Sequence, residues 1–123
     1  MDVAFAAGRT LGVWDIVRVD FPFADEARTR RRPALVIAHL PATERFSIVW
    51  TLMITSATRG VWPGDVPVTD LDLGGLPRPS MVRSGKGAAL DARLVERIGA
   101  LSEGDRGRVA ACVREALGVV LLG

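Results

Sequence analysis

The chain has 123 residues, of which 49% are hydrophobic and 24% are charged, and its formal net charge is +2. These values suit a single domain, 1–123, with a real hydrophobic core, and they exclude a disordered chain. The single cysteine excludes an internal disulfide, and no run of about 18 apolar residues predicts a transmembrane helix, so we expect a cytoplasmic protein with no membrane partner.

The first predicted element is a β-strand over residues 14–21. Val17, Val19 and Phe21 alternate with polar residues, which is the period-two pattern of a strand with one buried face. Pro22 ends the pattern. The residues that precede the strand, 1–11, are expected to form a flexible N-terminal arm.

The next two strands are predicted on either side of a turn near Pro41. Residues 24–32 are polar and basic with no hydrophobic period, so they are expected to form an exposed loop. Pro33 is expected to begin a short central strand over 34–38, because proline is tolerated at the first position of a strand. A longer strand is predicted over 46–55.

The remaining strands are predicted to be short. Residues 65–69 and 81–83 each carry a strand pattern, and Pro67 places the first of them at a sheet edge. Residues 91–94 suit one helical turn, whereas residues 95–100 fit either a strand or a helix.

The C-terminal part of the chain changes to a helical period. Ser102 followed by Asp105 resembles a helix-capping pair, and apolar residues recur behind it at Val109, Cys112, Val113, Ala116, Leu117 and Val120. We therefore predict an amphipathic helix over about 103–118. The last residues, 119–123, are expected to belong to the core or to a dimer interface. The whole pattern predicts a mainly β protein, with five or six strands closed into a small barrel that carries one helix.

The basic residues indicate a surface that binds phosphate. Lys86 is the only lysine among sixteen Lys and Arg residues. A codon bias toward arginine explains that ratio, but it does not explain a cluster of Arg28, Arg30, Arg31 and Arg32. Arginine presents a planar fork of donors that suits phosphate. Arg32 is the special member, because Pro33 and the strand behind it hold its cation in a fixed direction.

Two hydroxyl groups form the second candidate site. Thr55 and Ser56 stand at the end of the long predicted strand, where functional residues often gather. The alternative is that they only begin the turn over 57–60. Both interpretations remain open from the residues alone.

Other kinds of site are excluded by the residue types. With one histidine, His39, and one cysteine, Cys112, a single chain has no Cys/His zinc site and no Cys–His dyad. His39 is therefore expected to have a structural or surface role. Residues 84–87 (SGKG) resemble a phosphate loop but lack the glycine and the hydroxyl residue that this motif requires. No metal site is predicted.

Seven segments of the chain form an ordered set. They are 14–22 (WDIVRVDFP), 31–37 (RRPALVI), 54–56 (ITS), 62–68 (WPGDVPV), 75–83 (GLPRPSMVR), 90–91 (LD) and 97–102 (RIGALS). In order and spacing they resemble the MazF/PemK family of type II toxin–antitoxin toxins. Any one of these segments is a weak signal, but their ordered sum is strong. The family usually has a glycine where this chain has Trp14, and Gly12 lies two places earlier.

The resemblance implies a fold, an activity and partners. The fold would be a small SH3-like barrel of the PemK/CcdB type, with five to seven strands and a C-terminal helix, assembled as a homodimer. The activity would be cleavage of single-stranded RNA at particular sequences, with neither a metal nor a cofactor. A cognate antitoxin would hold this growth-arresting activity in check and would link the toxin indirectly to DNA.

The resemblance also implies site residues. In the family the arginine before the proline of the second hallmark is catalytic, and Arg32 matches it; the first threonine of the third hallmark is its partner, and Thr55 matches that. Some members use an acid in the loop ahead of the arginine, where Asp25 and Glu26 both lie and neither aligns uniquely. Either an acid takes the proton of the RNA 2′-hydroxyl, or Arg32 acts only electrostatically and water transfers the proton.

Further residues are assigned to RNA binding. Backbone phosphates are expected to contact Arg28, Arg30 and Arg31, with Ser56 beside the catalytic pair and with Arg83 and Lys86 as weaker candidates. Trp50 and Trp62 either stack on unpaired bases or, as we expect for tryptophan in a small chain, belong to the core.

Two alternatives come from other functional classes. A toxin with the same barrel would bind and poison a protein target such as a gyrase and would cut nothing, but it would need a C-terminal surface built for its target. An inactive relative would keep the barrel only to bind an antitoxin or nucleic acid. Arg32 and Thr55 favour the ribonuclease over both.

Overall fold

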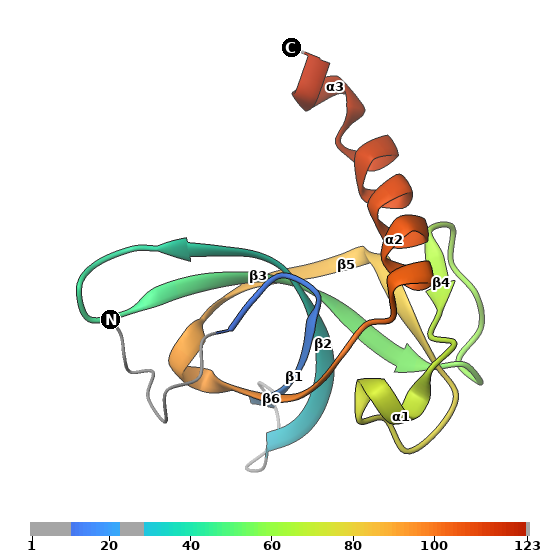
Figure 1. The fold of residues 1–123 in the computed structure, drawn as a ribbon, viewed down its shortest axis with the longest axis horizontal. Helices are drawn as coiled ribbons and strands as arrows, with labels where there is room; N and C mark the ends of the chain where they lie inside the picture. The colour runs from blue at the N-terminus through green and yellow to red at the C-terminus, as the bar shows by residue number, and fades with distance from the viewer. Residues whose placement is uncertain (1–10, 23–28, 123) are drawn as a thin grey trace.

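The computed structural model describes residues 11–22 and 29–122, which form one sheet followed by C-terminal helices (Figure 1). The predicted arm over 1–11 lies outside the described residues except for Leu11, whose side chain packs on the core. Along the chain the elements are β1 (Asp15–Pro22), β2 (Thr29–Pro41), β3 (Ser47–Ser56), β4 (Asp65–Pro67), α1 (Leu71–Gly74), β5 (Ser80–Asp91), the 3-10 turn Ala92–Leu94, β6 (Val95–Ala100), α2 (Glu103–Ala116) and α3 (Gly118–Leu122).

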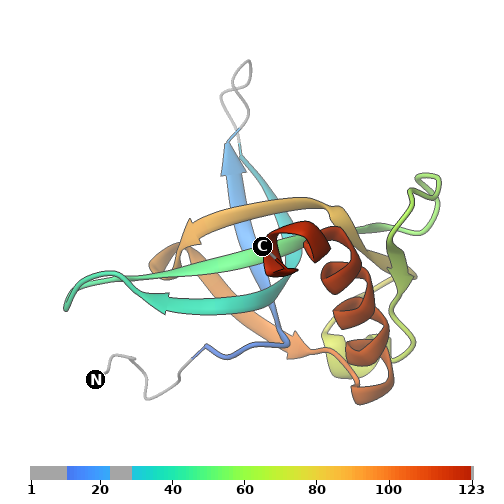
Figure 2. The same cartoon turned by 90° about the horizontal axis from the view of Figure 1, so that it is seen from above.

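The six strands form one strongly curled antiparallel sheet in the order β4-β5-β3-β2-β1-β6. The edge strands β4 and β6 are not paired with each other, so the sheet is open by hydrogen bonding. Helix α1 packs on β6, and α2 packs on β4 and β5, so the helices cover the open side (Figures 1 and 2). The prediction of a mainly β fold with a C-terminal helix is confirmed.

Strand β2 starts earlier than the sequence predicts. Of the loop expected over 24–32, residues 24–28 lie outside the described residues, Thr29 begins β2, and Arg30 to Arg32 pair with β1. Pro33 does not begin the strand but lies inside it, opposite Arg18. The hydrophobic residues of β2 begin only at Ala34, but its backbone pairing with β1 extends past them as far as Pro22 and Thr29. The basic residues are therefore mounted on a strand.

Strand β5 is also longer than predicted. Only 81–83 carries a strand pattern in the sequence, yet the strand runs from Ser80 to Asp91 because it pairs along the whole of β3. The pairing shifts between Leu52 and Met53, whose partners are Gly87 and Arg83, so residues 84–86 bulge out of the ladder. Residues 95–100, which fitted either period, form the strand β6.

The core consists of two clusters on opposite faces of the sheet. Leu35 belongs to one cluster and its neighbours Ala34 and Val36 to the other, as expected because successive strand residues point to opposite faces. The first cluster includes Leu101 and Val109, which attach α2 to the sheet. Because β1, β2 and β3 are buried on both faces, they form a rigid support for the polar residues near their ends.

Trp14 has a backbone conformation that favours glycine. Its φ is 80°, in the left-handed region that costs most residues about 1–2 kcal/mol. Two backbone hydrogen bonds of Trp14 offset this strain. Its N–H donates to the Val36 carbonyl at 2.8 Å, and its carbonyl accepts from the Leu101 N–H at 2.9 Å. Trp14 therefore occupies a turn whose backbone conformation normally favours glycine.

Two glycines allow α1 to lie directly against β6. Gly75 has a φ of 68°, and a Cβ there would lie 2.1 Å from the Ile98 carbonyl oxygen. A Cβ on Gly99 would lie 2.3 Å from the Gly74 carbonyl carbon. Only glycine permits this approach of backbone to backbone. The contact places Leu76 beside Ile98, and both residues line the pocket described below.

Helix α2 is held by a buried carboxylate. Ser102 is the N-cap, as predicted, but its side chain makes no capping hydrogen bond. Asp105 is instead fully buried and accepts hydrogen bonds from the Thr69 N–H at 2.7 Å, from the Thr69 hydroxyl, and from Arg108. Burial by itself raises the pKa of Asp105, but hydrogen bonds from Thr69, Arg108 and Ser102 outweigh burial and hold the pKa below its usual 3.8.

We expect Asp105→Asn to lower the free energy of unfolding at pH 7 by about 1.5–3 kcal/mol, the range for hydrogen bonds to a charged group. Because the folded-state pKa is depressed, the stabilisation is present above about pH 4 and is lost as pH falls through the folded pKa. Urea unfolding at pH 7 and pH 3 should therefore show the wild-type chain approaching the variant at pH 3. An equal difference in unfolding free energy between wild type and variant at both pH values would show that the charge of Asp105 does not cause the stabilisation.

The C-terminal apolar residues are not part of the core. In α3 the side chains of Val119, Val120, Leu121 and Leu122 are 63–90% exposed, and Figure 1 shows this helix extending away from the sheet. Of the two predicted roles for 119–123, burial in the core of this chain is wrong. No helix among the described residues is long and apolar enough to span a membrane.

Candidate functional site

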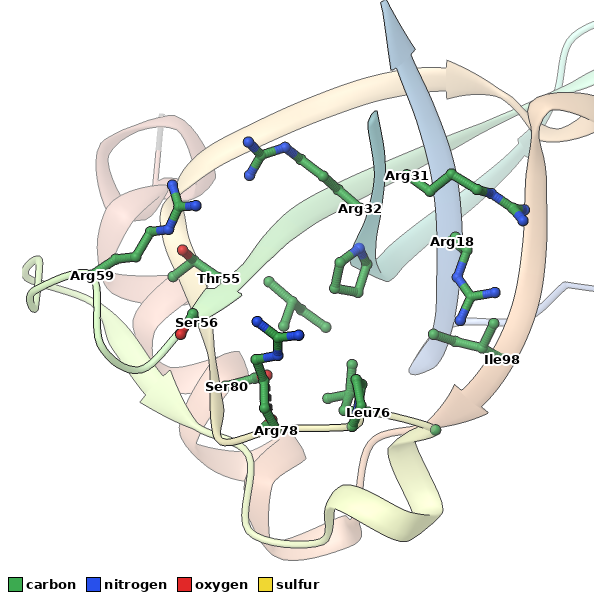
Figure 3. Close-up of a pocket in the computed structure, with 14 residues that line it drawn as sticks. Arg18, Arg31, Arg32, Thr55, Ser56, Arg59, Leu76, Arg78, Ser80 and Ile98 are labelled. Carbon is green, nitrogen blue, oxygen red and sulfur yellow. Dashed lines mark hydrogen bonds between the residues drawn. The ribbon is translucent and has the colours of Figure 1, made fainter. Parts of the chain in front are cut away.

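A pocket of about 310 Å³ lies at one end of the sheet, where strands from both halves of the chain terminate. Strands β1, β2 and β6 form one wall, the end of β3 and the loop that follows it form another, and the segment after α1 closes the base (Figure 3). The lining residues are Arg18, Arg31, Arg32, Pro33, Ile54, Thr55, Ser56, Arg59, Gly75, Leu76, Pro77, Arg78, Ser80 and Ile98.

The pocket is strongly cationic. Five arginines line it, and none of the described lining residues is acidic. Arg18, Arg59 and Arg78 form no ion pair with any described residue. Arginines gathered around an apolar base raise the local potential, which attracts a polyanion.

Arg32 and Thr55 reach this pocket from neighbouring strands. The β2–β3 register pairs Ala34 with Met53, and continuing it by two residues brings Arg32 across from Thr55. In Figure 3 the Arg32 guanidinium lies on the side of the pocket that also carries Thr55 and Arg59. The Thr55 hydroxyl makes no hydrogen bond to another described residue, so its donor and its lone pairs are available to a ligand.

Ser56 and Arg31 also line the pocket but have partners. The Ser56 hydroxyl lies 2.9 Å from the Thr58 hydroxyl and accepts the Thr58 N–H at 3.3 Å, so Ser56 both begins the turn and faces the pocket. Arg31 donates to Glu96 on β6 at 2.9 Å, and in Figure 3 it points toward that strand. Both side chains of this ion pair are more than half exposed. Such a pair contributes little stability, about 0–1 kcal/mol, so a phosphate can replace the glutamate.

Several predicted residues are not placed in the pocket. Asp25, Glu26 and Arg28 lie outside the described residues. Arg30 lies on β2, but only its backbone is described. Lys86 is exposed in the bulge of β5 and does not line the pocket.

Arg83, a weaker candidate for RNA contact, is instead buried within the protein. Its side chain is 7% exposed and makes two hydrogen bonds to Asp65, at 3.1 Å and 2.9 Å, and a third to the Gly60 carbonyl at 2.9 Å. These contacts use the guanidinium to hold the loop before β4. The hydrogen bonds from Arg83 keep the pKa of Asp65 below its usual value, so the pair stays charged at neutral pH.

Both tryptophans for which stacking was considered are exposed. Trp50 is 49% and Trp62 is 45% exposed, so the expectation that they belong to the core is wrong. His39 has the expected structural role: its Nδ1 donates to the Leu11 carbonyl at 2.8 Å, and its Nε2 lies 2.8 Å from the Ser47 hydroxyl. No group of three or more His, Cys, Asp or Glu side chains in the described ranges is arranged to hold a metal ion.

The sequence did not single out Arg18, Arg59 or Arg78. Arg18 fits a solvent-facing position of a strand, Arg59 fits part of a turn, and Arg78 is the single residue between Pro77 and Pro79. Arg18 and Arg78 lie inside segments that resemble the family and Arg59 lies between two of them, but in a chain so rich in arginine no local signal separates them from the others. Only the convergence of β1, the loop after β3 and the segment after α1 brings them together.

Comparisons with known proteins agree on a family. Residues 13–117 match the family described as PemK-like, MazF-like toxin of type II toxin–antitoxin system. A search of curated proteins gives no match. Two solved structures, each covering 89% of this chain, share its fold. A MazE–MazF complex from Deinococcus radiodurans has 22% identity, a TM-score of 0.65 and 97% of its own chain covered. An endoribonuclease in complex with its cognate antitoxin from a mycobacterial species has 15% identity, a TM-score of 0.68 and 96% covered.

Proposed function

This chain belongs to the family of PemK-like, MazF-like toxins of type II toxin–antitoxin systems, and we propose that it is a metal-independent endoribonuclease that cuts single-stranded RNA at particular sequences. One observation carries the proposal furthest. Arg32 and Thr55, the two residues that match the catalytic positions of the family, come from different strands and line the same cationic pocket.

In the proposed reaction the RNA supplies its own nucleophile. The 2′-oxygen attacks the adjacent phosphorus in line, the bond from phosphorus to the 5′-oxygen breaks, and the products carry a cyclic phosphate and a 5′-hydroxyl. Negative charge builds on the nonbridging oxygens in the transition state. The Arg32 guanidinium stabilises that charge more strongly in the transition state than in the substrate, which is the condition for acceleration.

Thr55 positions the phosphate, and the proton transfers fall to other groups. Its hydroxyl donates to a phosphate oxygen and holds the phosphorus in line with the 2′-oxygen. Arginine stays protonated up to about pH 12, so Arg32 is a poor base. Because the described lining residues include no carboxylate, water takes the 2′ proton and protonates the leaving 5′-oxygen, unless Asp25 or Glu26 does so. The double variant Asp25→Asn/Glu26→Gln distinguishes these routes, since only an acid-dependent route loses its rate.

The other arginines bind the phosphates on either side of the cut. Arg18, Arg59 and Arg78 surround the pocket without carboxylate partners among the described residues, and Arg31 faces β6. A single phosphate does not need five arginines, so we assign the additional cations to flanking phosphates of the same strand. Each phosphate contact on a single strand steepens the salt dependence of binding by about 0.7 in the logarithmic slope.

The proposed partners follow from the family. We propose that a cognate antitoxin inhibits this chain in the cytoplasm and connects it to DNA, and that the toxin is a homodimer. The exposed apolar residues of α3 are consistent with a surface that a second copy covers, because such patches are rarely left open in a monomer. Sedimentation equilibrium of the purified chain tests the dimer, and a monomer at micromolar concentration would exclude it.

The experiment that tests the activity is RNA cleavage in the presence of EDTA. Purified protein is incubated with a long single-stranded RNA, and the 5′ ends of the products are sequenced, with Arg32→Ala in parallel. Discrete cuts that persist in EDTA and disappear in the variant support a metal-independent ribonuclease and give its recognition sequence. Intact RNA after incubation with folded wild-type protein would exclude the proposed activity.

One observation favours a second candidate, the toxin that binds a protein target. That function needs an accessible C-terminal surface, and α3 exposes four apolar side chains in sequence, Val119 to Leu122. The cationic pocket favours RNA over this candidate, because a non-catalytic toxin has no use for Arg32 and Thr55 in one pocket. Growth arrest by Arg32→Ala as strong as that by the wild-type toxin would favour the protein-binding candidate.

A further inference from the structure

Trp62 is an exposed aromatic residue whose position is fixed by its neighbours. Its ring is 45% exposed, although tryptophan is normally well buried because of its large apolar area. The Arg83 guanidinium lies 4.1 Å from the centroid of the ring. One face of the ring is therefore covered by a cation, while 45% of the surface of Trp62 stays open to solvent.

Trp62 is held in place by a buried hydrogen-bond network. The Asp65 carboxylate accepts the backbone N–H of Trp62 at 2.7 Å and also binds Arg83. Arg83 donates a further hydrogen bond to the Gly60 carbonyl. The side chains of Asp65 and Arg83 are 0% and 7% exposed. A charged pair this buried is fixed by its hydrogen bonds, so the loop over 57–64 is braced at Gly60 and at Trp62 before β4 begins.

The same loop carries part of the pocket. Its first residues follow Thr55 and Ser56, and Arg59, three residues before Trp62, lines the pocket. On β5 the partner of Thr55 is Met81, and Arg83 beneath the ring is two residues further on, about 7 Å along the strand. Figure 2 shows the loop between β3 and β4 projecting from the body of the protein. The exposed ring is thus within reach of a nucleotide next to the one held in the pocket.

We propose that Trp62 is a stacking platform for an unpaired base that flanks the cut site. This inference rests on the proposed ribonuclease function and adds a subsite to it. Every base has a π-face, so stacking on Trp62 tolerates different bases and adds affinity without strict sequence selection. The bulge of β5 lies close to the ring, since a Cβ at Gly85 would be 3.6 Å from Cε3 of Trp62, and the next residue in this bulge is the exposed Lys86.

The test measures binding of an RNA oligonucleotide that contains the cut sequence, with a 2′-deoxy nucleotide at the cut site so that it is not cleaved. We expect Trp62→Ala to weaken binding about 5- to 150-fold, which corresponds to the roughly 1–3 kcal/mol of base–aromatic stacking. Trp62→Phe should recover most of that loss. Trp50→Ala is the matched control, because Trp50 is equally exposed but lies in the middle of β3. It should bind as the wild-type protein does.

A second measurement identifies the stacked nucleotide without relying on a variant. One abasic site is introduced at each position of the oligonucleotide in turn. A single flanking position should lose affinity for the wild-type protein and lose nothing further in Trp62→Ala. If Trp62→Ala binds and cuts as well as wild type while Arg32→Ala is inactive, the proposed stacking role of Trp62 is wrong but the proposed ribonuclease function is supported. If the folded wild-type protein neither binds nor cuts RNA, the proposed function fails and the platform fails with it.

Discussion

Replacing Arg32 by alanine should slow RNA cleavage by about 100- to 1,000-fold, the usual effect of removing one donor to a developing oxyanion. Arg32 is half-buried on β2 and lies outside both hydrophobic clusters, so the variant should fold normally. The loss should appear mainly in kcat, because the interaction strengthens as charge builds on the phosphate. Single-turnover cleavage of a defined oligonucleotide measures this rate directly.

Arg32→Lys separates charge from geometry. Lysine keeps the positive charge but lacks the planar fork that contacts two phosphate oxygens. We expect the lysine variant to retain only a little activity. Arg45→Ala is a suitable control, because Arg45 is exposed in the turn between β2 and β3 and does not line the pocket. Wild-type activity in Arg32→Lys would show that a point charge suffices and that the bidentate contact is unnecessary.

The sequence predicts those elements in which burial produces a regular spacing of hydrophobic residues. Val17 and Val19 alternate with polar residues because they share one buried strand face, and residues beyond 103 repeat at helical spacing because α2 packs on the sheet. Most of strand β5 cannot be predicted from such a spacing. Its second half, over 84–91, contains glycine, lysine and alanine, which have low strand propensity, and it is a strand only because β3 lies beside it. A partner distant in sequence leaves no local pattern.

The candidate site shows the same division. Arg32 precedes Pro33 inside one recognisable segment, and Thr55 lies in another at the end of β3, so the sequence identifies them. Arg83 stands in a similar segment, yet it is buried against Asp65, 18 residues earlier. The β4–β5 register places these two residues directly opposite each other, and that pairing depends on the edge strand β4 folding onto β5. An arginine that binds RNA and an arginine that braces a loop look alike until the sheet is formed.

Replacing Asp65 by alanine should destabilise the protein by about 3–5 kcal/mol, the usual cost of breaking a buried ion pair from one side. The variant leaves the Arg83 guanidinium buried without its counter-charge and leaves the Trp62 N–H without its acceptor. For a chain of this size the melting temperature should fall by about 10–20 °C. Thermal and urea unfolding at pH 7 measure both quantities. Asp72→Ala is the matched control, because Asp72 is exposed on α1 and should change stability by less than about 0.5 kcal/mol.

A second substitution decides whether the cost comes from the lost contact or from the charge left behind. Adding Arg83→Leu to Asp65→Ala removes the unpaired cation, and replacing both members of a buried pair by apolar groups is often nearly neutral. The double variant should therefore be more stable than Asp65→Ala alone, although its Trp62 ring loses the cation beneath it. If the double variant is instead less stable, the guanidinium stabilises the loop through Gly60 and Trp62 without needing Asp65. A loss below about 1 kcal/mol in Asp65→Ala would mean that the pair behaves like an exposed ion pair, and the loop would then need another brace to hold Trp62 beside the pocket.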